Sequence, residues 1–450
     1  MELPTGASAF HAVVSTHRIA DAQGVPEADI VTTAFLLDGT APGTRPVTFA
    51  INGGPGAGSA WLDLLAIGPW RVALPQEGPL PPSTPPNLVP NTESWLPFTD
   101  LVFIDPPGTG YSRLLSTSAD VRRRIWSTNG ELPVLASVIR RWLEANGRLA
   151  SPKLLVGESY GGFRGPRLAR SLAEGEGVAL GGLLLVSPLL DYNARSFEWE
   201  PYGYLTRLPS MAAANRHAVS RDQLADVEAY ASGEYLADFL HGMGDAAAVS
   251  RMASRVAELT GLPVDLVQRR GGRIDWWTER RDREPGRIAS AYDLSVTGID
   301  PLPNAGSAEN NDAVTEALRP VVTSAAASLY ADRLNWQPEG APAPRYELLS
   351  NDVFRAWTYN GQGQAPYSVS ALRIALAFDP RLHVTIMHGL YDLVTPYFAS
   401  KMILDQMPPA VAERARLIAL PGGHMFYTRD ASRQRLHDEG EAMVRQLAAP

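Results

Sequence analysis

The most constraining feature of this chain is a serine between glycines directly after a short apolar run. The run covers residues 154–156, and the serine lies in GESYGG, residues 157–162. Glycines on both sides let the backbone turn sharply from a strand into a helix, which leaves the Ser159 hydroxyl exposed at the end of a sheet. A serine needs a base and an orienting acid to act as a nucleophile, so the pattern indicates catalysis only if such partners follow. The alternative is a strand-to-helix turn with a capping serine.

Short apolar runs bounded by turn residues recur along the chain. They lie at residues 47–51, 101–104, 154–156, 183–186, 384–387 and 417–420. Runs of this kind are typical of strands buried on both faces, and helical segments such as residues 133–145 separate them. The pattern predicts an α/β fold with a mostly parallel central sheet.

The segment between the fourth and fifth runs has a different composition. It is rich in alanine and charged residues, and residues 222–259 show helical periodicity. We therefore predict that residues 1–190 and 376–450 are two parts of one core, with a largely helical cap, residues 191–375, inserted between them.

A proline-rich segment interrupts the first part of the core. Residues 77–90 contain six prolines, which exclude a helix or a central strand. We expect a stiff extended loop on the surface, and the alternative is a ligand for a proline-recognition domain.

Composition and charge limit the class of protein. Of 450 residues, 45% are apolar and 20% are charged, as in an ordinary globular protein. The formal net charge of −8 argues against nucleic acid or a membrane surface as a partner. The chain has no cysteine, which excludes disulfides and thiol catalysis, and no histidines have metal-ligand spacing. We therefore predict no metal and no cofactor.

The N-terminal segment MELPTGASAFHAVVSTHR lacks a basic region followed by an apolar one, and no stretch reaches membrane-span length. The sequence as written predicts a soluble protein. It would be cytoplasmic as it stands, or periplasmic or secreted if an export signal has been removed.

In the α/β-hydrolase fold a catalytic serine is followed by an acid and then a histidine, each on a loop after a strand. Of the six histidines after Ser159, only His424 follows a complete apolar run and a Pro-Gly-Gly turn. Asp392 follows the preceding run and can accept a hydrogen bond from His424 Nδ1, although an Asx cap of its loop is the alternative. We interpret His388, in the same run, as a packed strand-end residue. The sequence thus predicts Ser159, Asp392 and His424 as nucleophile, acid and base.

A tetrahedral intermediate needs two backbone donors for its oxyanion. One is the N–H of Tyr160, at the start of the predicted elbow helix. The glycine loop INGGPG, residues 51–56, directly follows an early run and can bring the N–H of Gly54 to the same position. We predict that Gly54 and Tyr160 form the oxyanion hole.

Four segments together resemble the serine carboxypeptidase family, peptidases with an α/β-hydrolase fold. They are INGGPG at 51–56, IDPPGTGYS at 104–112, GESYGG at 157–162 and GGHM at 422–425. A fifth point is Pro166, which by the resemblance ends the elbow helix early. The resemblance is to a cysteine-free, bacterial-type member, and it covers the core but not the insertion.

The resemblance implies a peptide substrate whose free C-terminal carboxylate is held by Asn52 and Glu158. Glu158 must then be protonated, because two ionised carboxylates in one small site repel, and we expect activity to be favoured at acidic pH. The set is incomplete, since Ala50 and Ala66 stand where the family has Trp and Glu. Met425 matches a family residue beside the leaving-group pocket, with an ordinary apolar filler as the alternative.

Three functions remain open from the sequence. The first is a serine carboxypeptidase that releases C-terminal residues through an acyl-enzyme. The second is an esterase or acyltransferase on the same three residues, which Ala50 and Ala66 favour, with a prolyl aminopeptidase as a weaker variant. The third is a non-catalytic binding protein, against which the retained Ser, Asp and His count. The preferred side chains and the oligomeric state are left open, with a homodimer as one alternative.

Overall fold

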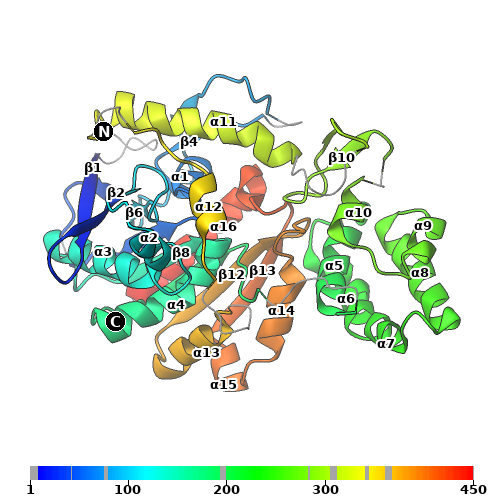
Figure 1. Cartoon of the computed structure of the whole chain (residues 1–450). Helices are drawn as coiled ribbons and strands as arrows, with labels where there is room; N and C mark the ends of the chain where they lie inside the picture. The colour runs from blue at the N-terminus through cyan, green and yellow to red at the C-terminus, as the bar shows by residue number, and fades with distance from the viewer. Residues whose placement is uncertain are drawn as a thin grey trace.

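The computed structural model describes residues 9–41, 43–75, 80–192, 199–281, 284–304, 312–339, 344–359 and 367–448 (Figure 1). The strands are β1 (Phe10–Ala20), β2 (Pro26–Leu37), β3 (Val47–Ile51), β4 (Trp70–Val72), β5 (Leu88–Pro90), β6 (Asp100–Ile104), β7 (Arg113–Leu114), β8 (Lys153–Glu158), β9 (Gly182–Val186), β10 (Arg287–Ala289), β11 (Thr297–Ile299), β12 (His383–Gly389) and β13 (Ala415–Leu420).

The helices are α1 (Ala60–Leu62), α2 (Ala119–Ile125), α3 (Glu131–Ala145), α4 (Tyr160–Gly175), α5 (Tyr202–Arg216), α6 (Ala225–Ser232), α7 (Glu234–His241), α8 (Ala246–Thr260), α9 (Val264–Arg269), α10 (Trp276–Arg281), α11 (Ala313–Ser328), α12 (Asn351–Ala356), α13 (Val369–Phe378), α14 (Tyr397–Asp405), α15 (Pro409–Ala412) and α16 (Asp430–Ala448). Four short helical turns accompany them: η1 (Asp63–Ile67), η2 (Arg221–Leu224), η3 (Leu329–Arg333) and η4 (Phe426–Thr428). Of the helices in these ranges, none is long and apolar enough to cross a membrane.

The centre of the molecule is a mixed sheet with the strand order β1-β2-β6-β3-β8-β9-β12-β13, and β7 pairs with β2. β2 is antiparallel to β1 and β6, whereas the strands from β6 to β13 run parallel to one another. This order defines the α/β-hydrolase fold and confirms the predicted fold class. All parallel strands end at one edge of the sheet, so the loops that follow them lie together there.

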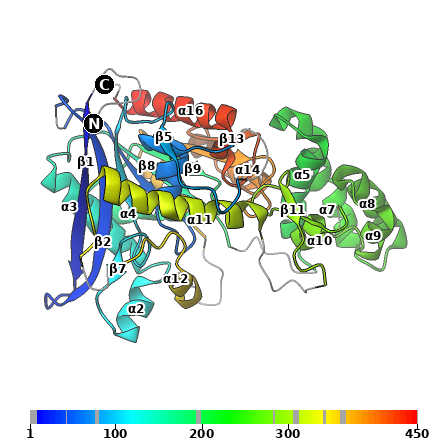
Figure 2. The same cartoon turned by 90° about the horizontal axis from the view of Figure 1, so that it is seen from above.

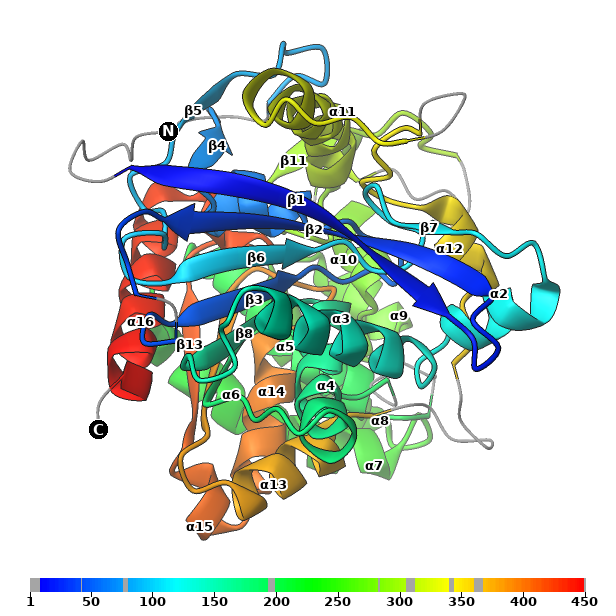
Figure 3. The ribbon, with the colours of Figure 1, turned by 90° about the vertical axis from the view of Figure 1, so that its left-hand side faces the viewer.

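The six apolar runs are all strands, namely β3, β6, β8, β9, β12 and β13, and the predicted helix at 133–145 is α3. The long hairpin of β1 and β2 was not predicted (Figure 3). β1 is an edge strand in which exposed and partly buried positions largely alternate, so it contains no continuous apolar run.

Two hydrophobic clusters fill the space between the sheet and the helices. One contains buried residues of α3, α4, α13 and α15, and the other contains buried residues of α1, α11 and α16. β3 contributes Phe49 to the first cluster and Ala50 to the second, because successive side chains of a strand point to opposite faces. The sheet is thus covered on both faces, as a parallel sheet requires.

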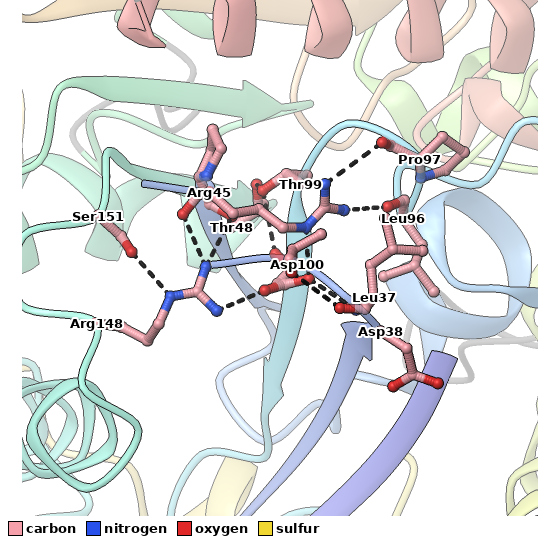
Figure 4. A network of polar contacts seen from close by, with 12 residues as sticks. Leu37, Asp38, Arg45, Thr48, Leu96, Pro97, Thr99, Asp100, Arg148 and Ser151 are labelled. Carbon is pink, nitrogen blue, oxygen red and sulfur yellow. Dashed lines mark hydrogen bonds and ion pairs between the residues drawn. The ribbon is translucent and has the colours of Figure 1, made fainter. Parts of the chain in front are cut away.

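A buried ion network lies at the end of the sheet where the parallel strands begin (Figure 4). Asp100, at the start of β6, accepts hydrogen bonds from Arg45 Nε at 2.8 Å and Arg148 Nη1 at 2.5 Å. Its side chain is only 1% exposed. Arg148 also binds the carbonyl of Arg45 and the hydroxyl of Ser151, so one carboxylate ties together the segments that precede β3, β6 and β8.

Helices α5 to α9 form a group beside the sheet, past β13, with a hydrophobic cluster of their own (Figures 1 and 2). This cluster includes Tyr397 and Phe398 of α14. α11 instead runs from this group back over the sheet, where Leu318 and Val322 pack against the core. The predicted boundary at 375/376 falls inside α13, whose Leu372 packs against the core. The three-part division of the chain stays an interpretation.

The proline-rich segment lies at the surface in the part that is described. Residues 80–87 contain neither helix nor strand, and β5 pairs only with β4 in a separate two-stranded sheet. Residues 77–79 of this segment lie outside the described ranges.

Candidate active site

Ser159 occupies a strained turn between β8 and α4. Its backbone has φ 58° and ψ −118°, and the residue is partly exposed. A side chain on Gly157 would lie 2.3 Å from the carbonyl oxygen of Gly161, and one on Gly161 would lie 2.3 Å from that of Ile51. The glycines are therefore required by close approach of the backbone as well as by the turn. This is the geometry of a nucleophile elbow.

The prediction that Pro166 ends the elbow helix is wrong. α4 continues through Pro166 to Gly175. Proline removes one hydrogen bond, to Gly162, but the helix buries Phe163, Leu168 and Leu172 against the sheet. This packing stabilises the helix beyond the missing bond.

His424 and Asp392 are hydrogen-bonded at the same edge of the sheet as Ser159. His424 Nδ1 lies 2.8 Å from Asp392 Oδ2, and both residues are buried. Asp392 Oδ1 also accepts the backbone N–H groups of Val394 and Thr395, at 2.8 and 3.0 Å. Burial lowers the pKa of His424, but the charge and hydrogen bond of Asp392, with the charge of Glu158, outweigh burial and raise this pKa above its ordinary value. The pair can therefore stabilise an imidazolium.

Two further residues hold this pair in place. The Thr395 hydroxyl lies 2.7 Å from Asp392 Oδ2 and 3.0 Å from His424 Nδ1. Ser187, after β9, donates to the carbonyl of His424 at 2.7 Å, and the preceding Val186 accepts the N–H of Ser159 at 2.9 Å. The backbones of Ser159 and His424 are thus fixed to the same strand end.

The glycine loop after β3 packs directly against the elbow. A Cβ on Gly53 would lie 2.5 Å from the Tyr160 nitrogen and 2.9 Å from Ser159 Cβ. Gly54 has φ +100°, which few other residues adopt. The loop therefore brings Gly54, one of the two predicted oxyanion donors, beside the chain segment that carries the other, Tyr160.

Glu158 and Asn52 form a buried pair next to Ser159. Asn52 Nδ2 donates to Glu158 Oε2 at 2.5 Å, and the Tyr427 hydroxyl donates to Glu158 Oε1 at 2.8 Å. Burial raises the pKa of Glu158, although His424, Tyr427 and Asn52 oppose this effect. Glu158 is therefore protonated over a wider pH range than an ordinary glutamate.

The two positions that depart from the family pattern and the residue predicted at the leaving-group pocket are apolar and buried. Ala50 and Ala66 belong to the core cluster on the α16 side of the sheet, and Met425 packs in the same cluster. No polar group is supplied from the positions of Ala50 and Ala66.

Tyr292, from the segment after β10, was missed by the sequence analysis. Its ring meets the ring of His424 edge-on, with centroids 5.3 Å apart, and its carbonyl accepts the N–H of His424 at 2.5 Å. Burial, together with the charges of Asp312, Asp392 and Glu158, raises the pKa of Tyr292 to about 12. Within the described ranges its hydroxyl makes no hydrogen bond. Gly423 packs closely against this segment, since a Cβ there would lie 1.9 Å from the Tyr292 carbonyl oxygen.

The remaining histidines do not join this group. His388 is fully buried and bonded to the Ser400 hydroxyl at 2.8 Å, in agreement with its interpretation as a packed residue. Burial lowers the pKa of His388 to about 4, so the ring is neutral at ordinary pH. In the described part of the chain, no group of three His, Cys, Asp or Glu residues is arranged to hold a metal.

Fold and elbow together define an α/β-hydrolase-fold protein. The model of the family described as "Serine carboxypeptidase" matches residues 35–252 of the chain. Similar curated proteins include Serine carboxypeptidase-like 5 of Arabidopsis thaliana, 28% identical over 173 residues that cover 36% of this chain and 38% of the relative. Pheromone-processing carboxypeptidase KEX1 of Yarrowia lipolytica is 30% identical over 161 residues that cover 35% of this chain and 24% of the relative.

The matched segment is therefore similar to the serine carboxypeptidase family, at distant identity. The matches span less than two fifths of the length of these relatives. Solved structures that match the chain at low similarity include a peroxisomal α/β-hydrolase of Saccharomyces cerevisiae (11% identity, TM-score 0.43, covering 98% of this chain and 90% of that one). Another is a thermophilic esterase of Thermogutta terrifontis (12% identity, TM-score 0.39, covering 97% of this chain and 100% of that one).

Proposed function

We propose that this protein is a serine carboxypeptidase that releases C-terminal residues from peptides. The observation that carries the proposal is the buried pair of Asn52 and Glu158, the residue immediately before Ser159. A serine, a histidine and an aspartate alone would suit any hydrolase of this fold. A protonatable acid and an amide beside the nucleophile add a means of recognising a free carboxylate.

In the proposed reaction, the Ser159 hydroxyl attacks the carbonyl carbon of the last peptide bond while His424 takes its proton. The tetrahedral intermediate then expels the leaving amine, which receives that proton from His424. Water attacks the resulting ester in the same way and releases the shortened peptide, restoring Ser159. Asp392 orients His424 and stabilises its charged form, which agrees with the raised pKa of His424.

The negative charge of each tetrahedral intermediate would be stabilised by the backbone N–H groups of Gly54 and Tyr160. The contact of Gly53 with the elbow supports this assignment, because it leaves no room for a side chain between the loop and Tyr160. Such preorganised donors contribute about 100- to 1000-fold in kcat each.

The C-terminal carboxylate of the substrate would be held by Asn52 and by Glu158 in its protonated form. Glu158 would donate its proton to the ionised substrate, and its raised pKa supports this role. The hydroxyl of Tyr292, whose ring contacts that of His424, is proposed as a further donor in place of the groups missing at Ala50 and Ala66. Met425 is proposed to border the leaving-group pocket.

An esterase or acyltransferase on the same residues is the second candidate. It is favoured by one observation, that Ala50 and Ala66 are buried and apolar where the resemblance places a Trp and a Glu. Such an enzyme would transfer the acyl group to water or to an alcohol without needing a free carboxylate.

Three matched substrates distinguish the candidates: a blocked dipeptide with a free C-terminus, its C-terminal amide, and the corresponding ester. We expect the free acid to be cleaved in preference to the amide, with Ser159→Ala inactive on all three. Equal cleavage of acid and amide would reject carboxylate recognition. Cleavage of the ester alone would favour the second candidate, and a folded protein that a fluorophosphonate does not label would indicate a non-catalytic binding protein.

A further inference from the structure

A buried arginine lies beneath the elbow and contacts the glycine loop. Arg164 is on α4, and its side chain is 1% exposed. Its Nη1 donates to the carbonyl oxygen of Asn52 at 2.5 Å. Asn52 is the residue that begins the glycine loop, so a charged side chain on the elbow helix holds the loop at its first peptide.

The same guanidinium is anchored by α3. Arg164 Nε donates to Glu131 Oε1 at 2.8 Å, and the Glu131 side chain is also 1% exposed. A buried ion pair of this kind gives little net stability, because desolvation of both charges offsets their attraction. The pair is therefore better explained by what Arg164 positions than by a contribution to folding.

Arg164 also contacts the residue after the nucleophile. Its guanidinium carbon lies 4.6 Å from the centre of the Tyr160 ring, in a cation–π contact. One side chain therefore touches the loop that carries Gly54 and the residue that supplies the other proposed oxyanion donor, Tyr160.

The contact with Asn52 restrains the loop through the geometry of the peptide unit. The C=O of Asn52 and the N–H of Gly53 lie in one plane and point in opposite directions. A hydrogen bond that fixes this carbonyl therefore fixes the plane of the peptide between Asn52 and Gly53. This restrains the orientation of Gly53 and the direction in which the chain enters Gly54. The restraint matters here because glycines otherwise have the greatest backbone freedom.

We propose that Arg164 is a positioning residue that holds the two oxyanion donors, Gly54 and Tyr160, in place before the substrate binds. The inference rests on the proposed serine-hydrolase chemistry but not on the choice between peptide and ester substrates. Arg164 does not touch the reacting atoms. Its loss should therefore reduce the stabilisation of the charged intermediate while leaving ground-state binding nearly unchanged.

The test compares Arg164→Met with Arg167→Met. Arg167 is a matched control because it lies on the same helix and contacts an aromatic ring, that of Phe163 at 5.2 Å, while its hydrogen bonds go to Thr128 and Asn129 instead of the glycine loop. The readouts are the second-order rate of Ser159 labelling by a fluorophosphonate, and kcat and KM with an ester. We expect Arg164→Met to lower the labelling rate and kcat about 10- to 100-fold with KM changed less than about threefold, and Arg167→Met to change each less than about threefold.

Two further variants separate positioning from folding. Arg164→Met with Glu131→Gln removes the buried carboxylate that the single variant leaves unpaired, and Arg164→Lys keeps a charged donor at this position. We expect the double variant to regain thermal stability without regaining the labelling rate, and Lys to restore part of that rate. A labelling rate that follows thermal stability across the variants, or an equal loss in Arg167→Met, would overturn the proposal. Absence of labelling in the unaltered protein would instead overturn the proposed function itself.

Discussion

The side-chain amide of Asn52 donates to Glu158 at 2.5 Å in the interior beside Ser159. Asn52 Oδ1 accepts the backbone N–H of Leu62, so the amide is oriented with its nitrogen toward Glu158. Under the proposed function, the protonation state of Glu158 would then decide whether an anionic substrate can bind.

The first prediction concerns pH. Because burial raises the pKa of Glu158, the acid stays protonated to a higher pH than an ordinary glutamate, and it ionises as the pH rises through this raised pKa. We expect KM for a free-acid peptide to increase over that range, since an ionised Glu158 repels the substrate. Glu158→Gln donates at every pH, so its KM should be independent of pH.

The control for this prediction is the matching ester, which has no carboxylate. Its KM should not depend on the ionisation of Glu158. The experiment measures KM against pH for the acid and the ester, in the unaltered protein and in Glu158→Gln. If KM changes with pH in the same way for the acid and the ester, Glu158 does not bind the carboxylate of the substrate.

The second prediction concerns the hydroxyl of Tyr292. Tyr292→Phe keeps the edge-on ring contact with His424 and removes only the hydroxyl, which has no partner in the described part of the chain. A hydrogen bond to a charged group is worth about 1.5–3 kcal/mol, so we expect KM for free-acid peptides to rise about tenfold or more. Steady-state kinetics with acid and ester measure it, and an equal change for both would contradict carboxylate binding by this hydroxyl.

The third prediction is a loss of stability in acid caused by His388. The folded protein keeps His388 neutral down to a pKa of about 4, whereas the unfolded chain takes up this proton near 6.5. Between these values the unfolded state binds more protons, so the free energy of unfolding falls as the pH falls from 6.5 to 4. The loss from this group is on the order of 3 kcal/mol when complete.

Denaturant unfolding at several pH values between 7 and 4 tests this prediction. His388→Gln keeps a partner for the Ser400 hydroxyl and should show a shallower loss of stability than the unaltered protein. His241→Gln, at a residue whose side chain is 60% exposed, is the control and should not alter the slope. If His388→Gln follows the same curve as the control, acid sensitivity arises from other groups.

Much of the fold could be predicted because buried strands differ clearly in sequence from their surroundings. The six apolar runs are strands, and their loops carry Ser159, Asp392 and His424 at one edge of the sheet. Local patterns did not reveal β1, whose exposed positions alternate largely with partly buried ones, or the continuation of α4 past Pro166, where tertiary packing outweighs the proline.

The supporting residues of the site could not be predicted for a different reason. Thr395 and Tyr292 act through contacts with His424 across 29 and 132 positions of the chain, and no local motif marks such a pairing. The role of Arg164 could not be predicted because an arginine on a helix is usually exposed. Only the fold places this one between Glu131 and Asn52.

The last prediction concerns the ion network at the opposite edge of the sheet. Asp100→Ala removes the carboxylate shared by Arg45 and Arg148, whose side chains are only 10% and 7% exposed, and leaves both charges without it. Breaking a buried pair in this way costs about 3–5 kcal/mol.

Asp29→Ala is the control, because it breaks a two-bond pair with Arg18, whose side chain is 60% exposed, and should cost less than about 1 kcal/mol. Since the network lies away from Ser159, Asp100→Ala should lower the free energy of unfolding without changing KM at temperatures where the variant is folded. Similar losses of stability in the two variants would mean that the network is no stronger than a surface pair.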